Sequence, residues 1–189
     1  MDEHSLRRQI CNASQALWAR GLIVGDCGLI STELHRRRYL VTPPGLRRCH
    51  LDESSLQIVD LGGSDINGTS ELDLACWQPH RIAYKAHEFG ADHGSTTRAT
   101  VTSTPPMTEA LRRVTGASDQ MALPGLPPLP IVDAEDESGI VDAMRTTNAI
   151  MLKGMGLFCC GSDLSSTLNT LEHIEHAATI ELACLNHRS

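Results

Sequence analysis

The chain has 189 residues, of which 41% are apolar and 21% are charged, and its formal net charge is −7. This length suits one hydrophobic core, so residues 1–189 are expected to form a single domain. The negative charge argues against a nucleic-acid partner, because phosphate backbones attract basic surfaces. No apolar run approaches the roughly 18 residues of a membrane-spanning helix, so no membrane partner is expected.

Seven cysteines stand at irregular spacing without a Cys-x-x-Cys pair. This pattern favours reduced thiols over a disulfide framework or a zinc ribbon. No apolar segment follows the first residues, as a secretion signal would require, and a cytoplasmic location is therefore predicted. Residues 35–38 form a basic segment, followed by Arg47 and Arg48. We expect a solvated basic surface there, with an acidic ligand as the alternative.

The first predicted element is an amphipathic helix from Ser5 to Arg20, because its apolar residues recur every three or four positions. Two β-prone runs, 29–34 and 39–42, then predict a hairpin. Thr42-Pro43-Pro44-Gly45 must leave the strand, since proline lacks the amide hydrogen that a sheet requires. The later predicted elements are strand 57–61, a helix from about residue 75, strand 98–102, helix 107–114, strand 129–132, helix 136–145, strands 149–152 and 156–160, and helix 163–186.

Three finer expectations concern single residues or strands within these elements. Pro79 is expected in the first turn of its helix, where a missing amide hydrogen has no cost. Strands 149–152 and 156–160 are apolar on both faces, which is typical of the centre of a sheet. Within the second of them, Cys159 and Cys160 should face opposite sides. The alternation of helices and strands indicates one layered α/β domain.

Several stretches, taken in order, together resemble the class II aldolase/adducin family. Leu22 to Ser31 resembles a Gly-x-x-Gly-Asn-Ile-Ser loop, and Val41 to Gly45 a Thr-Pro-Ser-Gly turn. Ala99 to Pro106 resembles the His-x-His-Pro-Pro stretch. The other matching stretches are the helix Trp77 to Tyr84, the strand pair Met151 to Gly161 and the last-helix pattern Glu175 to Ala178.

The resemblance implies a single three-layer α/β domain with a mixed, largely antiparallel central sheet flanked by helices. It also implies a homo-oligomer, commonly a tetramer, with clefts between subunits. The three histidines that hold the family's metal correspond here to Thr102, Thr104 and Met155. Neutral threonine is a poor zinc ligand and a thioether prefers softer ions, so no metal and no cofactor is expected.

The family's phosphate-binding groups are also largely replaced. Leu29 stands at the loop asparagine and Pro44 at the turn serine, while Thr42 and Gly45 are retained. An ungapped alignment on Trp77 and His80 places Leu74 and Ala75 at two phosphate-binding serines and Cys76 at the catalytic glutamate. A rival alignment places Thr69-Ser70-Glu71 on that motif, which makes Glu71 the acid/base residue but requires five inserted residues before His80.

Individual side chains leave alternatives open. Cys76 is either an inert thiol or a nucleophile whose pKa is lowered by a helix N-terminus. Lys153 is either a surface cation or a Schiff-base lysine. His173 and His176 lie one helical turn apart and form either a solvated face or part of a metal site. His80 is expected to be a packing or hydrogen-bonded helix residue.

These features suggest three functions. The first is a metal-free small-molecule-binding or assembly protein without zinc-dependent aldolase activity, with an active class II aldolase-like relative as one conceivable partner. The second is a repurposed, metal-independent lyase, isomerase or cyclase acting on a small carbonyl compound. The third is a metal-dependent sugar-phosphate aldolase with unrecognised ligands. Replacing polar positions by Leu29 and Met155 suits a less polar ligand than a sugar phosphate.

Overall fold

The computed structural model describes residues 2–35, 37–68, 72–88 and 97–187. The strands in these ranges are β1 Leu29–Glu33, β2 Arg38–Val41, β3 Gln57–Asp60, β4 Ala99–Ser103, β5 Gln120–Met121, β6 Leu129–Asp133, β7 Ala149–Lys153 and β8 Gly156–Gly161. The helices are α1 Glu3–Ala19, α2 Leu74–Glu88, α3 Pro106–Thr115, α4 Glu137–Met144 and α5 Leu164–Asn186, with a 3-10 turn η1 at Arg48–His50.

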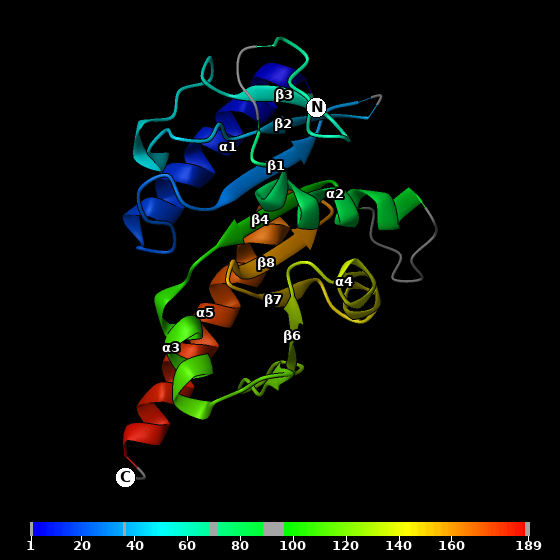
Figure 1. Cartoon of the computed structure of the whole chain (residues 1–189). Coiled ribbons are helices and arrows are strands. Elements are labelled where there is room, and N and C mark those ends of the chain that lie inside the picture. Colours follow the sequence, from blue (N-terminus) through cyan, green and yellow to red (C-terminus); the bar gives the residue numbers. More distant parts are fainter. Residues whose placement is uncertain (1, 36, 69–71, 89–96, 188–189) are drawn as a thin grey trace.

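The strands form one sheet in the order β3-β2-β1-β4-β8-β7-β6-β5 (Figure 1). Only the β6–β7 pair is parallel among the pairings of the described residues; the others are antiparallel. The mixed, largely antiparallel sheet is therefore confirmed. The apolar runs predicted β7 and β8 at the centre of the sheet; β8 lies there, paired with β4, and β7 is the next strand.

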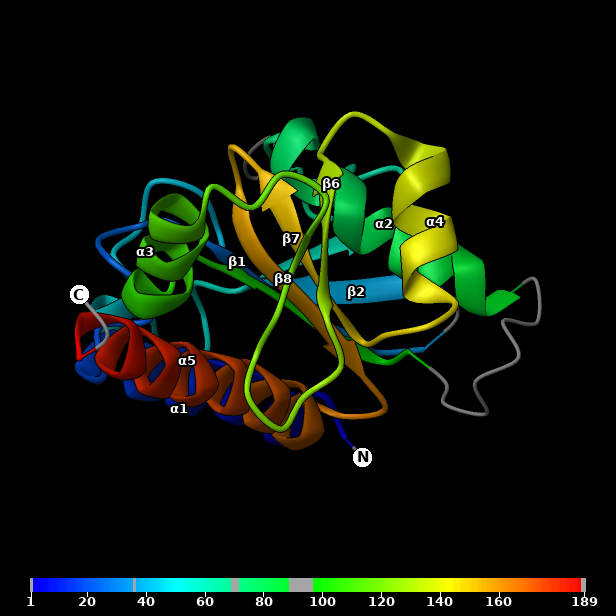
Figure 2. The same ribbon diagram turned by 90° about the horizontal axis from the view of Figure 1, so that it is seen from below.

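Helices cover both faces of the sheet and give three layers (Figure 2). α1, α3 and α5 share one hydrophobic core with the sheet, represented by Leu17, Leu111 and Leu171. α2 and α4 cover the other face. Cys159 belongs to the first core and Cys160 to the second, so the prediction that they face opposite sides is confirmed.

The helix ends follow from local chemistry. The Asp2 carboxylate accepts a hydrogen bond from the Ser5 amide at 2.8 Å and caps α1. Asp163 and Ser166 form a reciprocal capping box that begins α5. α3 ends at Gly116, whose φ of 65° is left-handed. None of the helices in the described ranges has the length and apolar character to span a bilayer.

One sequence expectation needs correction, and one strand was not predicted. Pro79 is the sixth residue of α2 and therefore lies in the second turn, not the first. Its missing amide hydrogen leaves the Ala75 carbonyl without the usual intrahelical donor. β5 was not predicted, because two residues are too few to show strand periodicity.

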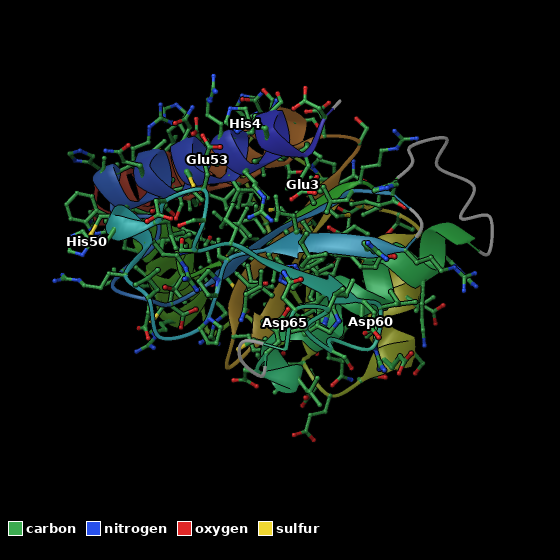
Figure 3. All side chains as sticks on the ribbon, turned by 90° about the horizontal axis from the view of Figure 1, so that it is seen from above. Glu3, His4, His50, Glu53, Asp60 and Asp65 are labelled. Carbon is green, nitrogen blue, oxygen red and sulfur yellow. The ribbon has the colours of Figure 1, made fainter. Side chains whose placement is uncertain are left out.

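The long connection between β2 and β3 is fixed against α1. Arg7 Nη1 donates to the carbonyls of Glu53 at 2.7 Å and Leu56 at 3.1 Å. His4 Nδ1 lies 2.6 Å from Glu53 Oε2, and Figure 3 shows these two residues beside the start of α1. Further along α1, buried Ser14 donates to the Arg48 carbonyl at 3.0 Å. The segment that follows β2 is thus held in place near the candidate site.

Candidate functional site

The predicted site positions converge at one end of the central strands. Leu29, at the start of β1, pairs with Thr102 near the end of β4. Gly156, at the start of β8, lies so close to the Ser103 carbonyl and Thr104 that any larger residue would collide with them. The turn carrying Met155 is consequently adjacent to Thr104. The sheet register therefore brings together Thr102, Thr104 and Met155, which we call the triad positions.

The three triad positions differ in their surroundings. Thr102 is buried, Thr104 is exposed, and Met155 is half-buried against the core under α2 and α4. Leu29 is buried beside Tyr39 and Trp77. The triad positions thus offer one enclosed hydroxyl, one exposed hydroxyl and one thioether.

Thr102 belongs to a buried hydrogen-bonded cluster that we call the His80 network. Its Oγ1 lies 2.7 Å from His80 Nε2, while the other ring nitrogen, Nδ1, lies 2.7 Å from Thr100 Oγ1 and 3.1 Å from Ser31 Oγ. Tyr84 completes the network, with its hydroxyl 2.9 Å from Ser31 Oγ. α2 is thereby tied to β1 and β4 through both ring nitrogens of one imidazole.

The surroundings of His80 keep its ring neutral. The side chain is 0% exposed, stacks on Trp77 with 5.8 Å between ring centroids, and meets the edge of Phe158 at 5.3 Å. Burial lowers the pKa of His80 to about 3. A neutral imidazole has one donor and one acceptor nitrogen, and both are occupied here by hydroxyls. His80 is therefore a hydrogen-bonded packing residue, as expected.

Arg48 is the main residue that the sequence interpretation misplaced. It was expected on a solvated basic surface with Arg47, but its side chain is only 2% exposed. Its guanidinium donates to the carbonyls of Pro43 at 2.8 Å, Leu46 at 3.0 Å and Gly28 at 2.6 Å. A run of basic residues does not distinguish an exposed arginine from one that turns inward to bind carbonyls.

The contacts of Arg48 join two loops of the site. One is the glycine loop that ends at Gly28, and the other is the Thr42–Gly45 turn. Thr42 is buried, and its Oγ1 accepts a hydrogen bond from the Ile30 amide at 3.2 Å. Gly45 is exposed with a φ of 70°, the left-handed backbone that favours glycine. Gly45 therefore allows the turn, Thr42 binds it to β1, and Arg48 fixes it to the glycine loop.

Cys76 lies in the first turn of α2, as predicted, and is exposed. Its Sγ lies 3.4 Å from Asp73 Oδ2 and can donate a hydrogen bond to that carboxylate. Partial burial, followed by the hydrogen bond and the negative charge of Asp73, raises the pKa of the Cys76 thiol to about 11. This is opposite to the lowering that a helix N-terminus would give, so the thiol is protonated at neutral pH.

The remaining candidate residues differ in how the structure describes them. Glu71, with Thr69 and Ser70, lies outside the described residues. Lys153 is exposed at the end of β7. His173 and His176 are exposed on α5. Within the part of the chain that the structure describes, no three His, Cys, Asp or Glu residues come together in a way that could hold a metal ion.

Glu175 is a further residue whose role the sequence did not indicate. Its carboxylate, projecting from α5, accepts hydrogen bonds from the Met107 amide at 2.9 Å and the Thr108 amide at 2.8 Å. Thr108 Oγ1 also donates to it, at 2.7 Å. The cap residue of α3, Pro105, makes no side-chain hydrogen bond. Glu175 therefore replaces the missing cap and fixes the chain immediately after Thr104.

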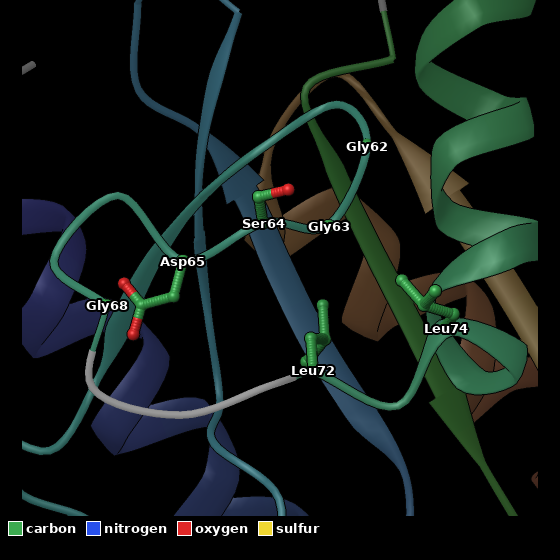
Figure 4. A pocket seen from close by; sticks show the side chains of 7 residues that line it. All are labelled: Gly62, Gly63, Ser64, Asp65, Gly68, Leu72 and Leu74. Atoms are coloured by element: carbon green, nitrogen blue, oxygen red, sulfur yellow. The ribbon is translucent and has the colours of Figure 1, made fainter.

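An open pocket of about 520 Å³ lies near the start of α2 (Figure 4). It is lined by Gly62, Gly63, Ser64, Asp65 and Gly68 from the turn after β3, and by Leu72 and Leu74. Leu74, one of the positions aligned with a phosphate-binding serine, is 61% exposed. The described lining is thus mostly backbone and leucine, with one carboxylate.

Comparison with solved structures finds the same fold in several enzymes and related proteins. YgbL from Klebsiella pneumoniae, described as a putative aldolase/epimerase/decarboxylase, is 22% identical over 97% of this chain and 91% of its own, with a TM-score of 0.81. L-fuculose-1-phosphate aldolase from Thermus thermophilus is 22% identical over 97% and 95%, with a TM-score of 0.77. A sugar-phosphate aldolase from Thermotoga maritima is 18% identical over 95% and 94%, with a TM-score of 0.73.

No curated protein matches the sequence. The model of one protein family does match, over residues 8–182, and it describes the class II aldolase and adducin N-terminal domain. This range contains the motifs from which the resemblance was inferred, together with the triad positions. The chain therefore belongs to the class II aldolase and adducin family.

Proposed function

We propose that this chain is a metal-free member of its family that acts as a small-molecule-binding or assembly protein and lacks zinc-dependent aldolase activity. The observation that carries the proposal is the 2.7 Å contact between Thr102 Oγ1 and His80 Nε2. The first of the triad positions is committed to the protein's own core. Because its hydroxyl is already hydrogen-bonded to His80, Thr102 is not available as a metal ligand.

The donor set does not fit zinc. Catalytic zinc is typically held by three nitrogen or carboxylate ligands, whereas the triad positions supply two neutral hydroxyls and a thioether. Aldol cleavage in this fold would need a Lewis acid to stabilise the enediolate. The side chains of Thr102, Thr104 and Met155 therefore lack the nitrogen or carboxylate groups that zinc requires.

The residue at the position of the family's acid/base glutamate also argues against aldolase activity. In the ungapped alignment it carries Cys76, whose thiol has a pKa of about 11 and is a poor proton acceptor at pH 7. His80, the imidazole of the His80 network, is buried and neutral. These properties support binding or assembly over proton-transfer catalysis.

The surface near the site supports assembly. Val24 precedes the glycine loop, Leu74 begins α2, and Met107 follows Thr104 by three residues; all three are large apolar side chains that are exposed. Exposed apolar side chains of this size are candidates for contacts with another protein chain. We propose that this region contacts another copy of the chain, as in a homotetramer, or an active relative. The seven free cysteines are compatible with a cytoplasmic location.

The proposal is tested by measuring zinc content and retro-aldol turnover of purified protein. L-fuculose 1-phosphate serves as the first substrate, with the Thermus thermophilus aldolase assayed alongside as a control. We expect far less than one equivalent of zinc per chain and no turnover with or without added zinc. About one equivalent of tightly held zinc, with turnover that chelation abolishes, would overturn the proposal.

A metabolite panel then distinguishes the remaining functions. Ligand-dependent thermal stabilisation without chemical conversion supports small-molecule binding. Metal-independent conversion of a carbonyl compound would establish the repurposed enzyme instead. Oligomer formation with no stabilisation by any metabolite supports a purely structural assembly role.

A further inference from the structure

A second cavity, separate from the triad positions, lies between α5 and the loop that joins β5 to β6. Its volume is about 160 Å³. Figure 2 shows this yellow-green loop passing beside the orange N-terminal half of α5. We name this space the α5 cavity. Because it is built by different elements, it is independent of the function proposed above.

The walls of the α5 cavity are mostly apolar. Leu123 and Leu129 come from the loop and β6, Ala149 from the start of β7, and Ile174 from α5; all four side chains are buried. The loop contains three prolines, at residues 124, 127 and 128, which restrict its backbone. The cavity is thus bordered by core residues and a conformationally restricted loop.

Three polar residues contribute to the lining, and the hydroxyls of two of them already donate hydrogen bonds within the protein. Thr147 Oγ1 donates to the Ala149 carbonyl at 3.2 Å, and Thr170 Oγ1 donates to the Ser166 carbonyl at 3.1 Å. His173 is exposed at the opening, where its ring can donate or accept one hydrogen bond. Among the described lining residues, His173 is therefore the one whose side-chain hydrogen-bond donor is not already used within the protein.

We propose that the α5 cavity binds a neutral, ring-sized apolar molecule with one hydroxyl group, the chemistry of a phenol. A cavity of about 150 Å³ with an aliphatic and aromatic lining accepts benzene in another protein, so the volume fits one ring. An anion is disfavoured, since none of the described lining residues is Lys or Arg and the chain carries a net charge of −7. The hydroxyl of the ligand faces His173.

The test is a ¹H–¹⁵N NMR titration of the full-length chain with phenol, with toluene and benzoate as comparators. We expect saturable shifts of the Leu126, Ala149 and Ile174 amides, with a phenol Kd of about 1 mM. Toluene should bind about threefold more weakly than phenol, and benzoate at least about tenfold more weakly. Absence of saturable shifts at these amides, or benzoate binding as tightly as phenol, would overturn the proposal.

Two variants locate the binding site. Thr170→Leu fills the cavity with a good helix former, and we expect it to weaken phenol binding at least about tenfold. Asn169→Leu is the matched control, because this neighbour on α5 is exposed and does not line the cavity. Equal phenol affinity in Thr170→Leu and wild type would place binding elsewhere and refute the assignment.

A third variant tests the polar contact. His173→Phe retains a ring but removes its nitrogens, so phenol should lose its roughly threefold advantage over toluene. An unchanged preference for phenol would refute the role of His173.

Discussion

At the scale of single residues, the identity of Thr102 bears on both the hydrogen bonding of the core and the candidate metal position. In the family pattern its position belongs to a metal-binding histidine, but here its hydroxyl completes the His80 network. Burial makes this contact important, because an imidazole nitrogen removed from water must have a partner. One threonine hydroxyl thus satisfies a nitrogen of a buried histidine, at a position that the family resemblance assigns to a metal ligand.

Replacing Thr102 by valine should measure this contact. Thr102→Val keeps the shape of the side chain but leaves His80 Nε2 without a partner, so the free energy of unfolding should fall by about 1–3 kcal/mol. Urea denaturation provides the measurement. Thr104→Val, at the exposed triad position, is the control and should change stability by less than about 0.5 kcal/mol. Equal effects in the two variants would show that the Thr102 contact contributes no more to stability than an exposed threonine does.

His80 also predicts a dependence of stability on pH. Its pKa is about 3 in the folded protein, below the value of about 6.5 for an unperturbed histidine. Between these values the unfolded chain binds the extra proton, so stability is fully present above about pH 6.5 and is lost as pH falls towards 3.

Between about pH 3 and 6.5, the free energy of unfolding that depends on His80 should fall by nearly 1.4 kcal/mol for each pH unit of acidification. Urea denaturation of wild type and His80→Gln at pH 4.5 to 7 measures it, with exposed His173→Gln as the control. The His80→Gln variant should show a shallower pH dependence, whereas His173→Gln should retain the wild-type slope. A wild-type slope in His80→Gln would mean that the buried ring is not responsible.

Cys76 gives a chemical prediction. Its raised thiol pKa implies slow alkylation by iodoacetamide at pH 7 and a rate that still increases towards about pH 11. Asp73→Asn removes the negative charge that contributes to this shift and should accelerate alkylation at pH 8. Peptide mass spectrometry resolves Cys76 from the other thiols. Rapid alkylation of wild type at pH 7, unchanged up to pH 10, would instead identify an activated nucleophile.

At the scale of secondary-structure elements, Glu175 links two helices. Its carboxylate on α5 binds the first amides of α3, so the position of α3 depends on α5. A negative charge at a helix N-terminus is also favourable to the helix dipole. The Thr104–Pro106 segment is held between this contact and the end of β4.

The prediction for this contact concerns stability. Glu175→Gln removes the charge and one acceptor oxygen, and it should lower the free energy of unfolding by about 1–2 kcal/mol. Glu181→Gln, on the same helix, is the control and should have little effect. The two variants are compared by urea denaturation at pH 7. A Glu175→Gln protein as stable as wild type would show that solvent caps α3 equally well.

At the scale of the whole molecule, the proposed assembly predicts its mass in solution. Light scattering coupled to size-exclusion chromatography should give about four times the chain mass of 20.5 kDa. Val24→Asp combined with Leu74→Asp should reduce this mass, because charges are costly within an apolar interface. Val114→Asp is the control, since Val114 is equally exposed near the far end of α3. A monomeric wild-type protein would refute the assembly role.

The family, the α/β fold and most of the elements were available from the sequence. Helical periodicity, apolar strand runs, and turn glycines and prolines are local signals, and they predicted α1, the β1–β2 hairpin, the β7–β8 pair and α5 well. The two-residue β5 gave too short a signal, and Pro79 was assigned to the wrong helical turn. The candidate site was predicted only as a set of aligned positions, of which Glu71 lies outside the described residues.

The sequence by itself determined which side chains stand at the triad positions, and hence that their donor set is unsuited to zinc. Only the tertiary structure decided what those side chains do instead. Thr102 meets His80 across 22 positions of the chain, Glu175 meets Thr108 across 67, and Arg48 turns inward to the Gly28 carbonyl across 20. Such contacts depend on distant segments that burial brings together, and no local pattern records them.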